Sequence, residues 1–263
     1  MAFTVPDIDE TQAPLLDHLV ELRARLLRAI ATVVVTFAVC LYFAGDIFGF
    51  LIRPLTQAFP PGQGKLVYTK LYEAFFVEMK VALFAAFFIS FPVIANQLWA
   101  FVAPGLYAKE KKAFLPFLIA TPVLFTAGAS LAYFFVMPTA FKWMLGFQGM
   151  KGGLKIEALP AAGDYLGLVM QFILAFGISF LLPVLLLLLN RAGIVSRKQL
   201  IGLRRYVIVV LTGVAAVITP PDLLSQILLL VPLLLLVEGS LVFLWLGERR
   251  EAKAVGAEPV IPA

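Results

Sequence analysis

The sequence is short of charge, cysteine and histidine. Only 14% of its 263 residues are charged and 62% are hydrophobic, with a mean hydropathy of +0.97, whereas a typical soluble domain is about 25% charged. The single cysteine, Cys40, excludes an internal disulfide and lies inside an apolar run, which predicts a small buried side chain. One cysteine and one histidine argue against a zinc site. The composition indicates a membrane protein.

The sequence also lacks the short motifs of common enzyme classes. It contains no His-Glu-x-x-His, Gly-x-Ser-Gly, Walker loop or Gly-x-Gly-x-x-Gly pattern. We therefore predict no catalytic activity and no cofactor. The net charge of +5 does not indicate nucleic-acid binding, because the basic residues stand at the ends of apolar runs and are better explained by membrane topology. His18 stands alone, and its default interpretation is a surface histidine.

The chain is rich in long uncharged stretches. Roughly 20 apolar residues suffice for a helix to cross about 30 Å of hydrocarbon. We predict six spans, at about 29–45, 75–102, 114–135, 165–190, 206–221 and 223–247. The fifth has only 16 uncharged residues and ends at Pro220-Pro221. It covers about 24 Å, which predicts a locally thinned bilayer.

The distribution of lysine and arginine predicts the topology. Fourteen lie in the two terminal segments and in the 109–112 and 191–205 loops, against seven on the other side, so both termini are expected in the cytoplasm. Prolines in or beside the spans should bend the helices; they are Pro92, Pro104, Pro116, Pro122, Pro138, Pro183 and Pro232. We predict an all-α polytopic membrane protein whose six bent helices form a concave cup.

The two ends of the chain differ from its middle. Residues 1–14 are polar and are expected to be disordered. An amphipathic helix over 15–28, with Glu21 and Arg25 at i,i+4 spacing, is expected along the membrane surface. This helix belongs to a six-helix transmembrane domain at 15–247, followed by a cytoplasmic tail at 248–263. The acidic N-terminus has no signal-peptide pattern.

Two kinds of polar residue are candidates for function. Glu21 and Glu110 are carboxylates in basic surroundings on the cytoplasmic side, although charge balancing also explains them. Polar groups at membrane depth are stronger indications of function, because burying them in the bilayer costs free energy. They are Gln171, Thr219, Gln226 and Glu238. An inter-helix hydrogen bond is an equally good interpretation for Gln171 and Thr219.

Several motifs follow one another in order along the chain. They are His18-Leu-Val-Glu-Leu-Arg-Ala-Arg25, Arg53-Pro54-Leu55, Gln97-Leu-Trp-Ala-Phe-Val-Ala-Pro-Gly-Leu-Tyr107 with Glu110 and Pro116, Ala132-Tyr-Phe-Phe-Val-Met-Pro138, Ala175-Phe-Gly-Ile-Ser-Phe-Leu-Leu-Pro183 and Thr219-Pro-Pro-Asp-Leu-Leu-Ser-Gln226. In this order and spacing the chain resembles the TatC family, the multi-spanning component of the twin-arginine protein translocase, over about residues 15–247.

The resemblance implies a receptor for signal peptides that carry two consecutive arginines on folded proteins. It implies that Glu21 and Glu110 read the arginines, with Arg23 and Phe101 in the supporting patch. The chain has no nucleotide motif, so the energy for export must come from elsewhere, and the resemblance implies that it is the protonmotive force. The chain would lie in the cytoplasmic membrane of a bacterium.

The resemblance also implies partners. Single-span TatA- and TatB-type helices would dock near the fifth and sixth spans, and self-association is a further expectation. Polar contacts and positions tied to assembly or translocation would be Pro54, Gln171, Thr219, Asp222, Gln226 and Glu238. The family commonly carries a polar residue, often Glu, where this chain has Leu181. Gln171 lies about 15 Å along a helix and about 80° round it from there, so it is an imperfect substitute.

Two other interpretations remain open. A secondary transporter of a small solute would suit the proline-broken helices and the buried Gln and Glu, but it would need internal repeats, which the sequence does not show. The second alternative is a purely structural membrane scaffold, in which the loss of Glu110 would leave peptide binding unchanged.

Overall fold

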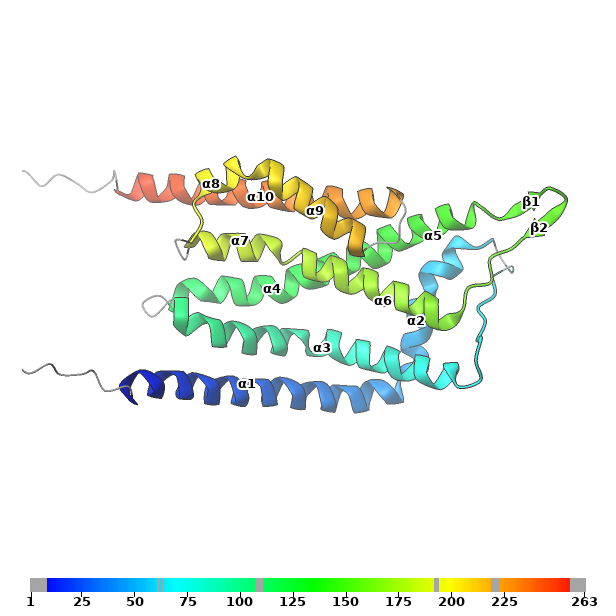
Figure 1. Ribbon diagram of the computed structural model, residues 1–263, viewed down its shortest axis with the longest axis horizontal. Coiled ribbons are helices and arrows are strands. Elements are labelled where there is room, and N and C mark those ends of the chain that lie inside the picture. Colours follow the sequence, from blue (N-terminus) through cyan, green and yellow to red (C-terminus); the bar gives the residue numbers. More distant parts are fainter. Residues whose placement is uncertain are drawn as a thin grey trace, which may run out of the picture. The chain divides into compact units, whose positions relative to one another are not determined.

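Helices make up almost all of the chain in the computed structural model, which describes residues 9–60, 62, 64–106, 111–191, 194–218 and 223–255 (Figure 1). The chain divides into two units. The first unit is Met1–Phe48 with Glu78–Leu118, and the second is Gly49–Val77 with Ile119–Ala263.

The first unit is built from two long helices, α1 (Asp9–Tyr42) and α3 (Glu73–Leu106). They meet through small side chains, with Cys40, Ala44, Ala82 and Ala86 all buried in one cluster. Small residues allow two helices to approach closely in a membrane. Near this cluster the Thr36 Oγ1 and Ser90 Oγ atoms are 2.7 Å apart. Cys40 is the small buried side chain that its apolar surroundings predict.

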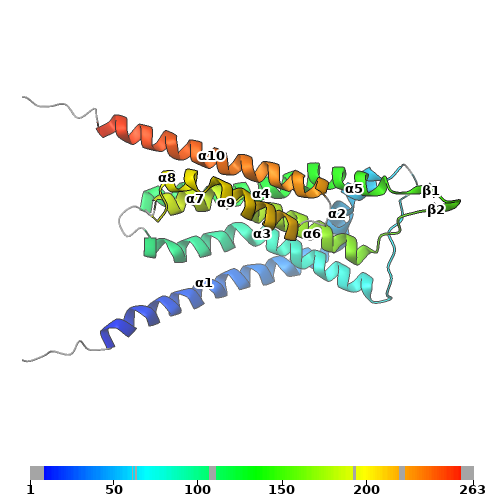
Figure 2. The same cartoon turned by 45° about the horizontal axis from the view of Figure 1, so that its top comes forward.

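The second unit holds the remaining elements. In chain order they are α2 (Ala44–Ala58) and α4 (Lys111–Leu131), which both begin in the first unit, the π-helix η1 (Ala132–Val136), α5 (Met137–Leu145), β1 (Gly149–Lys151), β2 (Leu154–Ile156), α6 (Ala162–Ser179), α7 (Leu182–Arg191), α8 (Arg197–Gly202), α9 (Arg204–Ile218) and α10 (Leu223–Val255). Helix α10 packs against α7, α8 and α9 (Figures 1 and 2).

Close packing of α4 on α6 fixes the centre of the second unit. A Cβ added at Gly128 would lie 2.5 Å from the Phe176 carbonyl oxygen, and one at Gly177 would lie 2.7 Å from the Phe125 ring. Neither position has room for a side chain. Phe125, Phe172 and Phe176 fill the space around these glycines and are almost fully buried.

Five described stretches of helix are long and apolar enough to cross a membrane. They are His18–Tyr42, Glu73–Phe101, Phe117–Leu145, Ala162–Asn190 and Leu223–Leu246. They correspond to the predicted spans one to four and six, which confirms the all-α polytopic class. The predicted fifth span corresponds to α9, whose 15 residues cover only about 22 Å. The count of six and the side of both termini are consistent with these helices and stay predictions, as does the concave cup.

Local structure differs from the sequence prediction in several segments. Helix α2 occupies part of the predicted 46–72 loop, and α1 begins at Asp9 and continues without a break into the first span. No glycine or proline lies between Leu15 and Tyr42, so nothing interrupts that helix. The fourth span breaks between Ser179 and Leu182, where Pro183 removes the donor that the Ser179 carbonyl would use. Helix α10 extends eight residues past the predicted end of the domain, to Val255.

Two loops on the predicted outer side are joined by Glu73. Its Oε1 accepts a hydrogen bond from the Gly163 N–H at 2.9 Å, and its Oε2 accepts from the Thr69 N–H at 2.6 Å and the Thr69 hydroxyl at 2.8 Å. Val67 and Ala161 add an isolated parallel β-bridge beside it. These contacts fix the start of α6 to the segment that leads into α3.

Candidate functional site

Glu21, the first predicted binding residue, lies on α1 and holds a guanidinium from its own helix. Its Oε1 accepts hydrogen bonds from Arg25 Nη2 at 2.6 Å and Nε at 3.0 Å, which confirms the pairing predicted from the i,i+4 spacing. The Glu21 side chain is 37% exposed, and such a pair on a helix surface is worth only about 0.3–0.5 kcal/mol. Among the described residues nothing donates to Oε2. The carboxylate is therefore held weakly and keeps one oxygen for another donor.

Phe101 is brought to the same corner of the first unit by His18. The two rings stack with their centroids 4.2 Å apart and an interplanar angle of 18°. His18 lies three residues before Glu21, and residues at i and i+3 share a helix face. Phe101 therefore packs on the face of α1 that also carries Glu21. No pattern in the sequence indicated this role of His18, because a contact between α1 and α3 depends on tertiary packing.

Arg23 and Glu110 are the other two residues that were predicted to bind the signal peptide. Arg23 is exposed, and two residues after Glu21 it lies about 200° round the helix. It is therefore not on the face that carries Glu21 and the ring stack. Glu110 lies outside the described residues. Of the four predicted binding residues, Glu21 and Phe101 therefore lie on α1 and α3 of the first unit, where the His18–Phe101 stack joins the two helices.

Gln97 is a residue that the sequence analysis did not single out for binding. It precedes Phe101 by one turn of α3, and its Oε1 is buried without a hydrogen-bond partner among the described residues. An unsatisfied buried acceptor costs about 1–3 kcal/mol. This oxygen is therefore able to accept a hydrogen bond from a water or a bound ligand.

The predicted partner-helix residues form contacts inside the second unit. Glu238 on α10 pairs with Arg204 at the start of α9, with 2.6 Å between Oε2 and Nη2. Gln226 donates to the Thr212 carbonyl of α9 at 3.4 Å. Both side chains tie α10 to the short helix α9. Gln171 is exposed on α6, while Thr219 and Asp222 lie outside the described residues.

The Arg204–Glu238 pair gives a measurable prediction. Both side chains are about half exposed, so we expect Arg204→Gln to lower the free energy of unfolding by about 1 kcal/mol or less. The double variant Arg204→Gln/Glu238→Gln should lose less than the sum of the single variants, because a neutral hydrogen bond can replace the ion pair. Thermal unfolding of the purified protein in detergent measures all three. Strictly additive losses would show that the two side chains do not interact.

Pro54 has a local role that follows from its missing N–H. Within α2 the Phe50 carbonyl would accept from residue 54, and proline cannot donate. The Tyr133 hydroxyl donates to this carbonyl at 2.6 Å, and the two aromatic rings stack 4.5 Å apart. Tyr133 reaches it from η1, and the Tyr165 hydroxyl of α6 donates to the neighbouring Leu51 carbonyl at 2.9 Å. Pro54 is itself almost fully buried. Two tyrosines thus anchor α2 at its proline.

The chemistry available in the described residues is recognition of charge and packing of helices. No group of three or more His, Cys, Asp or Glu side chains in that part of the chain could hold a metal ion. The polar side chains that come together are a carboxylate beside stacked rings in the first unit, and an ion pair with an amide in the second.

Comparison with known proteins identifies the family. A family model described as "Sec-independent protein translocase protein (TatC)" matches residues 17–232. The protein of that name from Magnetococcus marinus is 48% identical over 249 residues, 95% of this chain and 90% of its own length. The Aquifex aeolicus protein is 37% identical over 240 residues, 90% of this chain and 97% of its own.

Solved structures agree with the sequence comparison. Two crystal structures described as the twin arginine translocase receptor TatC match with TM-scores of 0.75 and 0.74 at 37% identity. They cover 86% and 87% of this chain and 98% of their own. The chain belongs to the TatC family of Sec-independent protein translocase proteins, multi-pass components of the twin-arginine translocase in the bacterial cytoplasmic membrane.

Proposed function

We propose that this chain is the signal-peptide receptor core of its translocase and binds the consecutive arginines of a signal peptide with Glu21. The observation that carries the proposal is a carboxylate that already holds a guanidinium, beside an aromatic stack at one corner of α1 and α3. The structural relatives are described as twin arginine translocase receptors. Family membership also favours this role over a small-solute transporter or an inert scaffold.

The Arg25 contact is a model for the ligand. Guanidinium is planar, permanently charged and able to donate two hydrogen bonds to one carboxylate. Arg25 does this to Oε1 of Glu21, so the carboxylate is accessible to a guanidinium in a suitable geometry. An arriving arginine can bind Oε2 or replace Arg25, since the internal pair is weak. A lysine ammonium cannot form the same fork, which gives a preference for Arg-Arg over Lys-Lys.

The ring stack supplies the second part of the site. An arginine side chain can stack on an aromatic face while its guanidinium pairs with a carboxylate. His18 stacks on Phe101 and shares a face of α1 with Glu21, which supports a site in which one arginine uses both the ring and the carboxylate. Glu110 would read the other arginine and Arg23 would stand in the surrounding patch, as the family resemblance implies.

Partner helices have a separate place in the proposal. Single-span TatA- and TatB-type helices would pack on α9 and α10, whose outward side chains include the exposed Val209, Val217, Leu235 and Phe243. We assign six residues to partner contacts or assembly: Pro54, Gln171, Thr219, Asp222, Gln226 and Glu238. The protonmotive force would drive transport, and further copies of the chain would join the assembly. The functional core would be residues 15–247, with 1–14 and 248–263 as its terminal segments.

The proposal is tested by comparing two peptides on the purified full-length chain. An Arg-Arg signal peptide should bind roughly 10- to 100-fold more tightly than the same peptide with Lys-Lys, because a hydrogen bond to a charged group contributes about 1.5–3 kcal/mol. Fluorescence anisotropy of labelled peptides gives both dissociation constants. Equal affinities would show that the chain does not distinguish guanidinium from ammonium groups.

A further inference from the structure

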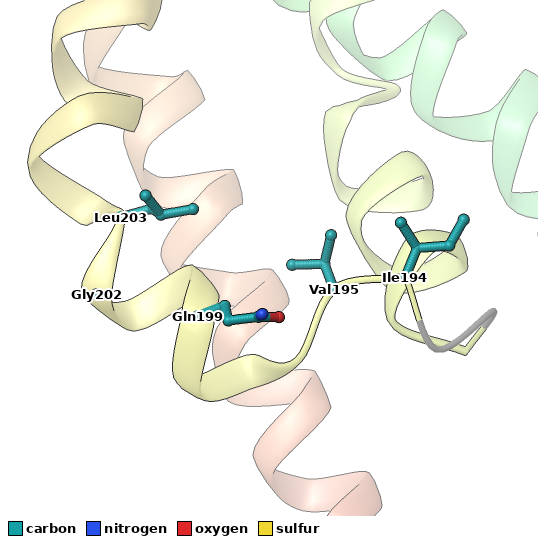
Figure 3. A pocket seen from close by; sticks show the side chains of 5 residues that line it. All are labelled: Ile194, Val195, Gln199, Gly202 and Leu203. Carbon is teal, nitrogen blue, oxygen red and sulfur yellow. The ribbon is translucent and has the colours of Figure 1, made fainter.

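A groove lies in the second unit between α8 and the loop that precedes it. It is lined by Ile194, Val195, Gln199, Gly202 and Leu203 and encloses about 440 Å³ (Figure 3). Three of these five residues are aliphatic, and Gln199 supplies the polar group. Ile194 is 62% exposed and Leu203 is 45% exposed. The groove is therefore apolar and open.

Hydrogen bonds hold both walls of the groove in place. Ser196 and Gln199 form a capping box at the start of α8, in which Gln199 Oε1 accepts from the Ser196 N–H at 2.8 Å. On the other wall, Asn190 Nδ2 donates to the Val195 carbonyl at 2.9 Å. Because Gln199 Oε1 serves the cap, its Nε2 donors remain for a ligand oxygen. A Cβ added at Gly202 would meet nothing within 4 Å, so the space beside this residue is open.

The surroundings of the groove carry positive charge. Residues 191–206 contain five arginines or lysines and no acidic residue. Lys198 is exposed and precedes Gly202 by one turn of α8, on the same face. Arg205 follows the groove, with its guanidinium 4.8 Å from the Tyr206 ring. Arg204 is the basic residue here that Glu238 neutralises.

The position of the groove along the chain places it at the membrane surface. It lies between the end of α7 and the start of α9, where two apolar helices meet the basic loop. Tyr206 is 54% exposed at this level, and tyrosine is enriched at the interface of membrane and water. Basic pockets between helices at such a level suit the head groups of anionic lipids.

We propose that this groove binds one anionic phospholipid of the adjacent leaflet. The aliphatic side chains of Ile194, Val195 and Leu203 contact an acyl chain. Lys198, Arg205 and the Gln199 amide bind the phosphate. Charge complementarity selects a lipid over an apolar partner helix, because a helix would leave the basic residues without a counter-charge.

Binding is measured on the purified full-length chain by native mass spectrometry and by thermal unfolding in detergent. The added molecules are phosphatidylglycerol, phosphatidylcholine with matched acyl chains, and inorganic phosphate. We expect phosphatidylglycerol to be retained and to raise the melting temperature, while phosphatidylcholine and inorganic phosphate do neither. Equal retention of both lipids overturns the role of charge, and an equal effect of inorganic phosphate overturns the role of the acyl chain.

Two variants locate the site. Lys198→Gln/Arg205→Gln should weaken retention of phosphatidylglycerol by about 5-fold for each charge removed, whereas Lys142→Gln/Lys155→Gln removes the same charge elsewhere and should leave it unchanged. Gly202→Leu should fill the groove and abolish retention, with Gly213→Leu as the control, since a Cβ at Gly213 also meets nothing within 4 Å. Retention at the level of the unmodified chain in both site variants overturns the proposal.

Discussion

Replacing Glu21 by glutamine should weaken the binding of an Arg-Arg signal peptide roughly 10- to 100-fold. The variant keeps the size and the helix but replaces an ionised acceptor by a neutral amide, and hydrogen bonds to charged groups contribute about 1.5–3 kcal/mol. Fluorescence anisotropy with the labelled peptide gives the dissociation constant. The Lys-Lys peptide should lose less, because its ammonium groups do not form the fork.

Arg25→Gln is the matched control for this result. It breaks the same internal pair from the other side and leaves the Glu21 carboxylate intact. It also removes a positive charge that competes with the peptide. We expect an affinity within about 3-fold of the unmodified chain, or tighter, since the internal pair is worth only about 0.3–0.5 kcal/mol. A loss as large as that of Glu21→Gln would mean that the internal pair, and not the carboxylate, supports binding.

Removing the Tyr133 hydroxyl should lower the free energy of unfolding by about 1–3 kcal/mol, because Tyr133→Phe leaves the Phe50 carbonyl beside Pro54 without a donor. The ring stack on Phe50 is kept, so the change isolates the hydrogen bond. In a Pro54→Ala background, residue 54 has its own N–H for that carbonyl. The same Tyr133→Phe change should then cost little. Thermal unfolding in detergent of the four proteins completes the cycle.

Tyr165→Phe is the control for the proline effect. Its hydroxyl donates to the Leu51 carbonyl, which can also accept from the Leu55 N–H within α2. Its cost should therefore be smaller and should not depend on residue 54. If Tyr133→Phe costs the same with proline and with alanine at position 54, the explanation of Pro54 given above is wrong.

The sequence predicted what depends on composition and local spacing. Charge-free runs located the spans, and the i,i+4 spacing predicted the Glu21–Arg25 pair. Helix α2 was missed although Ile47, Leu51 and Leu55 recur every four residues, because the surrounding prolines and glycines favoured a loop. That signal could have been found.

Contacts between distant residues could not be predicted in the same way. The His18–Phe101 stack and the Arg204–Glu238 pair each join two residues that are far apart in sequence and lie on different helices. Neither has a local pattern, since both depend on how the helices pack. From the sequence alone, Glu238 was therefore interpreted as a lone acidic group inside a span, whereas in the structure it pairs with Arg204 at the start of α9.

The break in the fourth span bears on whether Gln171 can substitute for the polar residue that relatives carry at the position of Leu181. This residue lies between α6 and α7, and its N–H donates to the Ile178 carbonyl at 3.0 Å. Its distance from Gln171, which was predicted for one straight helix, does not apply across such a break. Gln171 belongs to α6 alone and is exposed there.

A double-mutant cycle between Glu21 and the two peptide arginines tests the proposed recognition most directly. The unmodified and Glu21→Gln chains are each titrated with the Arg-Arg and Lys-Lys peptides. If the carboxylate pairs with guanidinium, the preference for Arg-Arg should fall about 10-fold or more in the variant, a coupling of at least about 1.4 kcal/mol. An identical preference in both chains would contradict the proposal.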